Sequence, residues 1–310
     1  MFAPAARQIG LEIAGVRLLM SSAVPDLAIE LPSEAAAFRS PSAAAAPWAP
    51  DISLQVDWLT DDPRAAVPAA AELQFDSGKL WQLLRTRHEL WFRFTSPRYG
   101  EAPYKLARLS RDLSTGTIYV DRRCATAGLV RALEYPLDEL LWMHWLPARR
   151  GVIVHACGLV DDQGRGYLFV GQSGAGKSTT ARLWQNARPV TVLSDDRIIV
   201  QERDGRFWMS GTPWHGEAGL ASPRSAPITR LLLLEQATSC GLDQVGGAVA
   251  TGRLLAASFF PFHDPVALLA TSQLLADLAR AVGCVQLRFT PDENALHAVS
   301  HQVALSGGRL

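Results

Sequence analysis

The stretch that decides the fold is Gly171-Gln172-Ser173-Gly174-Ala175-Gly176-Lys177-Ser178. It matches the pattern G-x-x-x-x-G-K-[ST], a loop whose backbone N–H groups converge on phosphate oxygens. Lys177 is expected to reach the β and γ phosphates, and Ser178 to complete the coordination of a magnesium ion. Nucleotide contacts are predicted at Gly171, Ser173, Gly174, Ala175, Gly176, Lys177, Ser178 and Thr179. The sequence therefore predicts a site for a nucleoside triphosphate.

The residues on either side of this loop indicate a strand and a helix. Residues 166–170 are apolar, and residues 179–187 favour a helix whose N-terminus would meet the phosphate. Another apolar strand, 152–160, precedes them across the short polar turn 161–165. So short a turn joins antiparallel strands, because a parallel pair needs a crossover of about a dozen residues or more. This pattern argues against the purely parallel sheet of Ras-like or RecA-like nucleotidases.

Two adjacent carboxylates follow the next apolar strand. Residues 190–194 lead directly into Asp195 and Asp196. One carboxylate at such a strand end can hold the metal of the nucleotide, and the second can act as base toward an acceptor hydroxyl. A solvated Asp-Asp turn is the alternative, and the phosphate loop favours the functional interpretation. His155, on the strand before the loop, fits a site role and a packing role equally well.

A predicted hairpin over 197–210 is followed by the segment Gly211-Thr212-Pro213-Trp214-His215-Gly216-Glu217. Its glycines, proline and polar residues suggest a shaped loop over the site, in which His215 and Glu217 contact substrate. A structural turn with Trp214 packed beneath it fits the same residues equally well.

The chain is predicted to contain two domains, residues 1–147 and residues 148–310. The first is β-rich, with strands expected at 15–20, 52–59, 90–94 and 115–120 and a helix at 135–146. The second is mixed α/β, with a strand at 228–235, helices at 253–259 and 265–282, a strand at 285–289 and a last helix from Asp292. Six of the nine tryptophans lie in the first domain, where core and surface packing is favoured over a binding platform.

The composition is that of a soluble globular protein, with 48% hydrophobic and 19% charged residues. Thirty basic and thirty acidic residues cancel, so neither nucleic acid nor an anionic membrane is expected as a partner. No apolar run approaches a membrane span, and the N-terminus lacks the basic start and apolar core of a secretory signal. The four cysteines lie far apart without a C-x-x-C pair, which favours reduced cysteines in a cytoplasmic protein.

With these motifs in place, residues 151–236 resemble the catalytic domain of HPr kinase/phosphorylase, whose fold is related to that of ATP-dependent phosphoenolpyruvate carboxykinase. The shared order is a histidine strand, a hairpin, a phosphate loop, a helix and paired aspartates. Thr179 and Thr180 after the loop are closer to the carboxykinase pattern than the glutamate usual in HPr kinases. Gly211-Thr212-Pro213-Trp214 looks more like the HPr-kinase-related proteins of bacterial peptide-tailoring gene clusters. Some of those, the lasso-peptide kinases, phosphorylate a serine of a precursor peptide.

The resemblance implies a mixed-sheet P-loop domain and an ATP- and Mg²⁺-dependent kinase that acts on a serine of a peptide or small protein. It implies Asp196 as the base, Asp195 with Ser178 beside the metal, His155 beside the transferred group and Lys177 on the phosphates. Two alternatives stay open. One is a small-molecule or carboxykinase-like phosphotransferase, and the other is a nucleotide-dependent binding or scaffold protein with little turnover. The sequence also leaves a homo-oligomer open.

Overall fold

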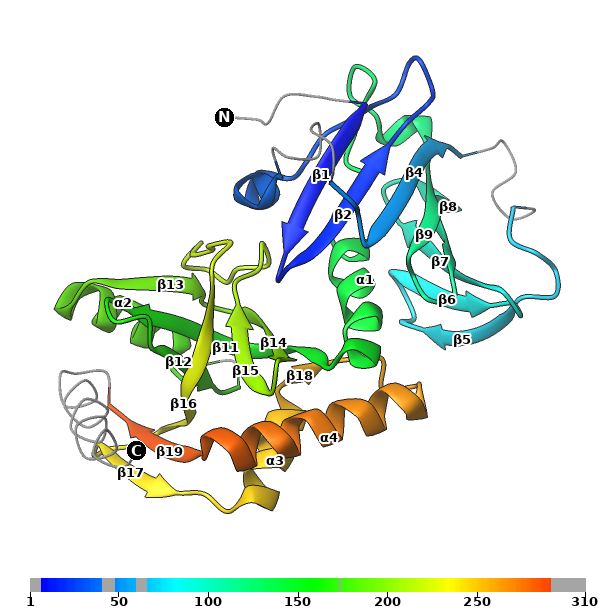
Figure 1. Cartoon of the computed structure of the whole chain (residues 1–310). Coiled ribbons are helices and arrows are strands. Elements are labelled where there is room, and N and C mark those ends of the chain that lie inside the picture. The colour runs from blue at the N-terminus through cyan, green and yellow to red at the C-terminus, as the bar shows by residue number, and fades with distance from the viewer. Residues whose placement is uncertain (1–6, 41–47, 60–65, 173, 291–310) are drawn as a thin grey trace. The chain divides into compact units, whose positions relative to one another are not determined.

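The computed structural model describes residues 7–40, 48–59, 66–172 and 174–290. The chain is a mixed α/β protein that divides into two compact units, Met1–Trp145 and Leu146–Leu310. This division falls two residues before the boundary expected from the sequence. Figure 1 shows the elements of each unit along the chain.

The first unit is built on one large sheet. Its eight strands lie in the order β1-β2-β4-β9-β8-β7-β6-β5, and all neighbours are antiparallel except β2–β4 and β4–β9. The strands in chain order are β1 Gln8–Ile13, β2 Val16–Ser21, β4 Ile52–Trp58, β5 Glu72–Asp76, β6 Trp81–Arg85, β7 Glu89–Ser96, β8 Gly100–Ser110 and β9 Thr115–Val120. The four strands predicted from the sequence are all present in this β-rich unit.

Smaller elements complete the first unit. β3 (Ala28–Ile29) and β10 (Leu129–Val130) pair as a short parallel ribbon. The predicted helix is α1, Leu137–Trp145, whose buried side includes Leu141, Trp142 and Trp145. Two 3₁₀ helices are η1 (Ser33–Phe38) and η3 (Arg122–Cys124).

Strand β11 (Gly151–Asp161) is the central strand of the second unit, because it pairs with four other strands. Along one edge, β11 pairs first with β14 and then with β13, and along its other edge with β18 and then with β12. β12 also pairs in parallel with β16, which continues through β19 to β17. The strands are β11 Gly151–Asp161, β12 Gly166–Val170, β13 Val190–Ser194, β14 Arg197–Arg203, β15 Arg206–Ser210, β16 Ser225–Gln236, β17 Gly241–Gln244, β18 Ser258–Phe259 and β19 Val285–Phe289.

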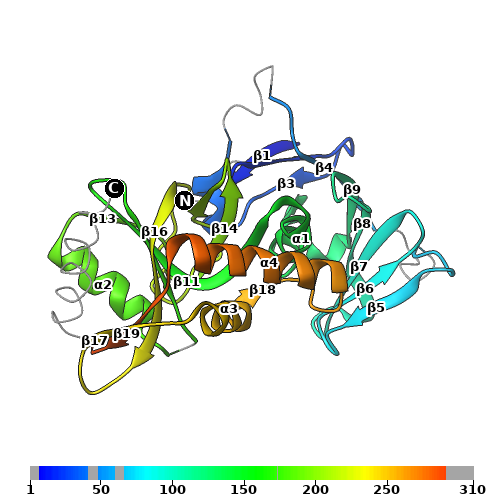
Figure 2. The same cartoon turned by 60° about the horizontal axis from the view of Figure 1, so that its bottom comes forward.

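Helices cover both sides of this arrangement because its central strands are apolar on both faces. In β12, Leu168 and Val170 join the core beneath α3 (Gly247–Ala256) and α4 (Pro265–Val282). Tyr167 and Phe169 point the opposite way, into the core beneath α2 (Lys177–Ala187). Figure 2 shows α3 and α4 running together, apart from α2.

Most elements of the second unit match the sequence prediction. The antiparallel pairing of β11 with β12 and the hairpin of β14 with β15 are confirmed. The predicted helix 253–259 is wrong in its bounds, because the structure has α3 over Gly247–Ala256 and then strand β18. Two glycines at its start, Gly246 and Gly247, concealed the beginning of the helix. The helix expected from Asp292 lies outside the described residues.

α4 matches its predicted bounds, residues 265–282, because both ends carry clear signals. The Asp264 carboxylate accepts from the backbone N–H groups of Val266 and Ala267 at 2.9 and 3.4 Å, and Pro265 occupies the first turn. Within the described part of the chain, α4 is the one helix long and apolar enough to cross a membrane. Its Leu274, Leu275 and Leu278 are buried in the core, whereas Val266 and Leu269 are exposed.

Candidate functional site

The phosphate loop leaves the end of β12 and enters the first turn of α2. Gly174 and Gly176 have φ angles of 80° and 103°, in the left-handed region that glycine adopts without strain. A Cβ on Gly176 would lie 2.7 Å from the Phe289 ring, so this position has no room for a side chain. Ser173, which the sequence places among the nucleotide contacts, lies outside the described residues.

Lys177 is held in a position that suits a phosphate ligand. Its ammonium donates to the carbonyls of Gly171 and Gln172 at 2.9 and 3.0 Å, so the side chain turns back along the loop. Burial lowers the pKa of Lys177, and the charge of nearby Asp196 opposes that effect in part. The loop is braced from outside by Gln236, whose amide donates to the Gly174 carbonyl at 2.5 Å.

Ser178 and Asp195 form a small oxygen-rich site beside the loop. The Ser178 hydroxyl donates to Asp195 Oδ2 at 3.2 Å, and Asp195 is buried. Two backbone N–H groups, those of Gly216 and Ala218, donate to the two oxygens of Asp195 at 3.0 and 3.2 Å. A hydroxyl and a carboxylate are ligands that Mg²⁺ accepts when phosphates and waters supply the rest. These residues therefore fit a nucleotide-bound magnesium ion.

No group of three or more His, Cys, Asp or Glu side chains capable of holding a metal occurs among the described residues. Ser178 and Asp195 supply only two oxygen donors, so they fit a metal ion whose remaining ligands come from phosphate and water. A site made wholly of protein side chains would need more donors in the described part of the chain.

Asp196 faces a different group of side chains. Its Oδ1 lies 2.8 Å from His155 Nε2, and its Oδ2 accepts from the guanidinium of Arg197. The Arg197 guanidinium lies 4.1 Å from the centre of the Phe259 ring, and His155 meets the same ring edge-on. The three polar side chains are 19–25% exposed, so solvent and a substrate can still reach them.

These neighbours keep the Asp196 carboxylate charged. Burial raises the pKa of Asp196, but the hydrogen bond from His155 and the charges of Arg197, His155 and Lys177 outweigh it. The net result is a pKa below the ordinary value of an aspartate. Asp196 is therefore ionised at neutral pH and can accept a hydrogen bond from a hydroxyl.

The sheet pairing explains why residues far apart in sequence meet here. Ala156 of β11 is opposite Val170, the last residue before the phosphate loop, and His155 is opposite Arg197. On the edge of β11 that also pairs with Arg197, Gly158 is opposite Ser194, the last residue before the paired aspartates, and Val170 lies on the other edge. One strand thus holds the starts of both functional segments in register.

The structure brings together all five residues predicted as catalytic or metal-binding: Lys177, Ser178, Asp195, Asp196 and His155. Thr179 is exposed in the first turn of α2, and Gly171, Gly174, Ala175 and Gly176 form the loop. The site gains two residues that the sequence interpretation missed. Arg197 directly follows the aspartates, a signal that was available, whereas Phe259 arrives only through the pairing of β18 with β11.

The segment 211–217 contributes in a different way from the one expected. Its backbone binds Asp195 through the Gly216 amide, and the Thr212 hydroxyl donates to the Arg197 carbonyl at 2.7 Å. Glu217 is exposed, and His215 Nδ1 lies 2.9 Å from the Gly216 carbonyl oxygen. The segment therefore acts as a backbone support for the aspartates.

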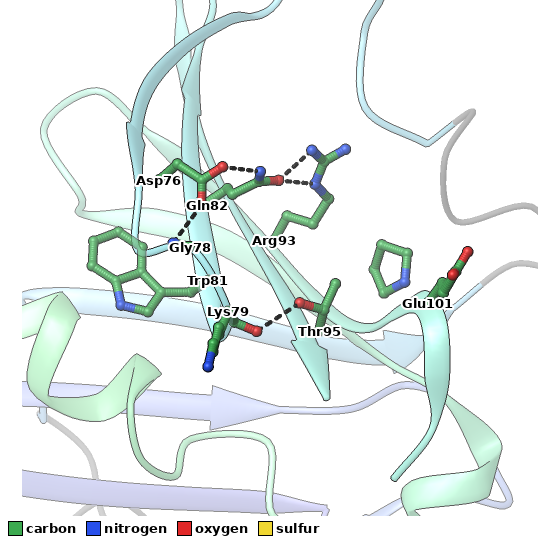
Figure 3. A pocket seen from close by; sticks show the side chains of 9 residues that line it. Asp76, Gly78, Lys79, Trp81, Gln82, Arg93, Thr95 and Glu101 are labelled. Atoms are coloured by element: carbon green, nitrogen blue, oxygen red, sulfur yellow. Dashed lines mark hydrogen bonds between the residues drawn. The ribbon is translucent and has the colours of Figure 1, made fainter. Parts of the chain in front are cut away.

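The first unit has a polar cavity of about 330 Å³ of its own (Figure 3). Asp76 accepts from the Gln82 amide at 2.6 Å, and the Gln82 carbonyl oxygen accepts from Arg93. Trp81 also lines this cavity. Three other tryptophans of the unit, Trp91, Trp142 and Trp145, are buried, which supports packing as the main role of these side chains.

No protein-family model matches this chain, and a search of curated proteins also found no match.

Proposed function

We propose that this protein is an ATP- and Mg²⁺-dependent kinase that transfers the γ-phosphoryl group to a hydroxyl, with a catalytic domain of the HPr kinase type. One observation carries the proposal. The lysine and serine of the phosphate loop lie beside Asp195, while the neighbouring Asp196 is held between His155 and Arg197. The two aspartates thus have separate tasks within one site.

The loop side of the site would bind and orient the triphosphate. The backbone N–H groups and Lys177 would neutralise the β and γ phosphates, and Ser178 with Asp195 would hold the metal. Bound Mg²⁺ would supply positive charge that offsets the negative charge of the triphosphate. Positioning and charge stabilisation supply most of the catalysis in phosphoryl transfer, and this arrangement provides both.

The Asp196 side would receive the acceptor. The hydroxyl oxygen attacks the γ phosphorus, the bond from that phosphorus to the β–γ bridging oxygen breaks, and ADP leaves. Asp196 accepts the hydroxyl proton, and His155 and Arg197 hold its carboxylate in place. A carboxylate with a lowered pKa is a weak base, so Asp196 acts mainly by orienting the hydroxyl as the proton is lost.

The proposed acceptor is a serine of a peptide or small protein, which the resemblance to HPr-kinase-related proteins supports. A small-molecule or carboxykinase-like phosphotransferase and a binding protein with little turnover are the alternatives. Incubation with γ-labelled ATP separates the three, because label would appear on a peptide, on a metabolite, or on neither despite tight nucleotide binding.

Two variants test the roles of the two halves of the site. Lys177→Ala should lower ATP affinity about tenfold to a hundredfold, because it removes a charged hydrogen-bond donor to the phosphates. Asp196→Asn should keep ATP affinity within about twofold and lower transfer by about a hundredfold or more, in the range of general base catalysis. Calorimetry and label transfer measure the two quantities.

Asp204→Asn is the matched control for the second variant, since Asp204 is an exposed aspartate in the turn between β14 and β15. It should leave both quantities unchanged. Full transfer activity in Asp196→Asn would contradict the role given to Asp196, and undiminished ATP binding in Lys177→Ala would contradict the nucleotide site.

A further inference from the structure

A cavity of about 630 Å³ lies against the outer side of the phosphate loop, and its lining differs from that of the phosphate site. Its floor includes the buried apolar residues Val170 and Leu233, which belong to the core beneath α3 and α4, and neighbouring Leu234 lines it as well. The volume is in the range of roughly 300–1,000 Å³ that is typical of ligand sites, and an apolar floor with a polar rim is their usual character.

The position of Lys177 shows which end of the triphosphate this cavity faces. Gly171 and Gln172 line the cavity, and their carbonyls are the acceptors of the Lys177 ammonium. In loops of this kind the lysine reaches the β and γ phosphates. The cavity is therefore at the γ end, where a second substrate approaches, and the nucleoside extends from the opposite end.

The far wall of the cavity is connected to His155. Ala257 lines it, and the Ala257 carbonyl accepts from the His155 backbone N–H at 2.7 Å. A ligand in the cavity would thus lie between the loop that holds the γ phosphate and the strand that carries the His155–Asp196 pair. None of Lys177, Ser178, Asp195 and Asp196 lines the cavity, so phosphate binding leaves it available.

The charged and polar residues at the rim determine which kind of ligand the cavity can bind. Arg253 Nη2 lies 3.5 Å from Glu235 Oε2, and Gln286 connects the two residues by hydrogen bonds of 2.9 and 2.7 Å. The two opposite charges are paired with each other, so the rim offers no net charge to a ligand. Ala256 at the end of α3 and Ala257 directly after it also form the wall, beside Arg253, and the small side chains of the two alanines leave the apolar floor accessible.

We infer that this cavity binds an apolar side chain of the acceptor peptide, close in sequence to the hydroxyl that receives the phosphoryl group. The inference rests on the proposed kinase function and adds a specificity site to it. An aliphatic side chain would cover Val170, Leu233 and Leu234, and the peptide backbone would run past Ala257 toward Asp196.

The test uses a peptide library with a central serine and randomised flanking positions, together with γ-labelled ATP. The full-length protein should favour Leu, Ile, Val or Met at one position near the serine. Ala256→Trp would fill the cavity and should reduce labelling of the preferred peptides about tenfold or more, the scale on which apolar pockets discriminate. Affinities for ATP and for inorganic tripolyphosphate, measured by calorimetry, should not change.

Ala248→Trp is the matched control, because Ala248 is an exposed alanine of the same helix and does not line the cavity. Two results with Ala256→Trp would overturn the inference. One is an unchanged peptide preference, and the other is weaker binding of ATP with unchanged binding of tripolyphosphate, which would place the nucleoside in the cavity.

The inference and the proposed function fail in different ways. A wild-type protein that binds ATP but labels no peptide in the library overturns the peptide site and leaves the nucleotide site standing. A wild-type protein that does not bind ATP overturns the proposed function itself.

Discussion

Asp195 and Asp196 are adjacent in the chain, but their surroundings give them different chemistry. Asp195 is buried and its carboxylate accepts hydrogen bonds from two backbone N–H groups and from the Ser178 hydroxyl. These bonds hold the carboxylate in place beside Ser178. Asp196 is partly exposed and lies between an imidazole and a guanidinium. Buried, fixed oxygens suit a metal ligand, and an accessible charged oxygen suits a hydroxyl acceptor.

Arg197→Gln should make the activity more sensitive to acid. The charge of Arg197 helps to hold the pKa of Asp196 below its ordinary value, so removing that charge raises the pKa. Transfer requires the ionised carboxylate, and its loss on acidification should therefore begin at a higher pH in the variant. A pH profile of kcat/KM for label transfer measures the shift of the acid limb.

The lowered pKa of Asp196 also makes the free energy of unfolding decrease on acidification. A depressed aspartate pKa stabilises the folded state above the unfolded pKa, and this contribution is lost as the pH falls through the folded value. The control for Arg197→Gln is Arg206→Gln, which changes an exposed arginine of β15. It should leave the pH profile of kcat/KM unchanged. An acid limb that stays fixed in Arg197→Gln would show that Asp196 is not the group that titrates.

Among the elements, the segment between β15 and β16 supports Asp195 from outside the loop. The Ser222 amide donates to the Leu193 carbonyl at 2.9 Å, and Ala221 forms a bridge with Ser194. Together with the Gly216 and Ala218 amides, these contacts fix the segment along the end of β13. The position of Asp195, the proposed metal ligand, thus depends on the segment between β15 and β16, which is not itself proposed to bind the metal.

Gly216→Ala should disturb this support and weaken magnesium-dependent turnover. The new Cβ would lie 2.9 Å from Asp195 Oδ2 and 3.2 Å from Asp196 Cβ, so one or both aspartates must move. Small displacements of a catalytic group can cost up to about a hundredfold in rate, and we expect a loss of about tenfold or more. A Mg²⁺ titration of ATP turnover would also show a higher half-saturating concentration.

Gly252→Ala is a suitable comparison, since a Cβ there meets nothing within 4 Å and the glycine lies within α3. It should keep the wild-type magnesium dependence. If Gly216→Ala also kept it, the amide contacts to Asp195 would have no part in metal binding.

The elements also show how far sequence reasoning reaches. The short turn 161–165 was sufficient to predict the antiparallel pairing of β11 and β12, because no crossover fits into it. The carboxylates after β13 were predictable from position. Phe259 was not, since a two-residue strand has too few residues to show a period, and its pairing with Ile153 depends on tertiary contacts. The role of the 216 and 218 amides was equally hidden, because backbone donors leave no trace in side-chain chemistry.

At the scale of the whole molecule, every residue of the proposed nucleotide site belongs to the second of the two compact units. Saturating ATP with Mg²⁺ should therefore protect amide hydrogens in the described residues after 145. A ligand at about a hundred times its Kd stabilises the folded state by about 2.7 kcal/mol. Hydrogen–deuterium exchange with mass spectrometry measures the protection, and peptides from residues 7–40 and 66–145 should exchange as in the free protein.

The Lys177→Ala variant at the same ATP concentration provides the control and should show weaker protection, because its lower affinity reduces the stabilisation by the ligand. Equal protection of both units by the nucleotide would contradict the assignment of the site to one unit.

The pairing of β11 on both edges has a practical consequence for protein engineering. A substitution in β11 would disturb up to two of its four partner strands at once, among them the strands that lead into the phosphate loop and the aspartate pair. α3, in contrast, contributes the exposed residues Arg253 and Ala256 to the wall of the outer cavity. A library intended to change the proposed acceptor preference should therefore keep β11 constant and vary the exposed end of α3.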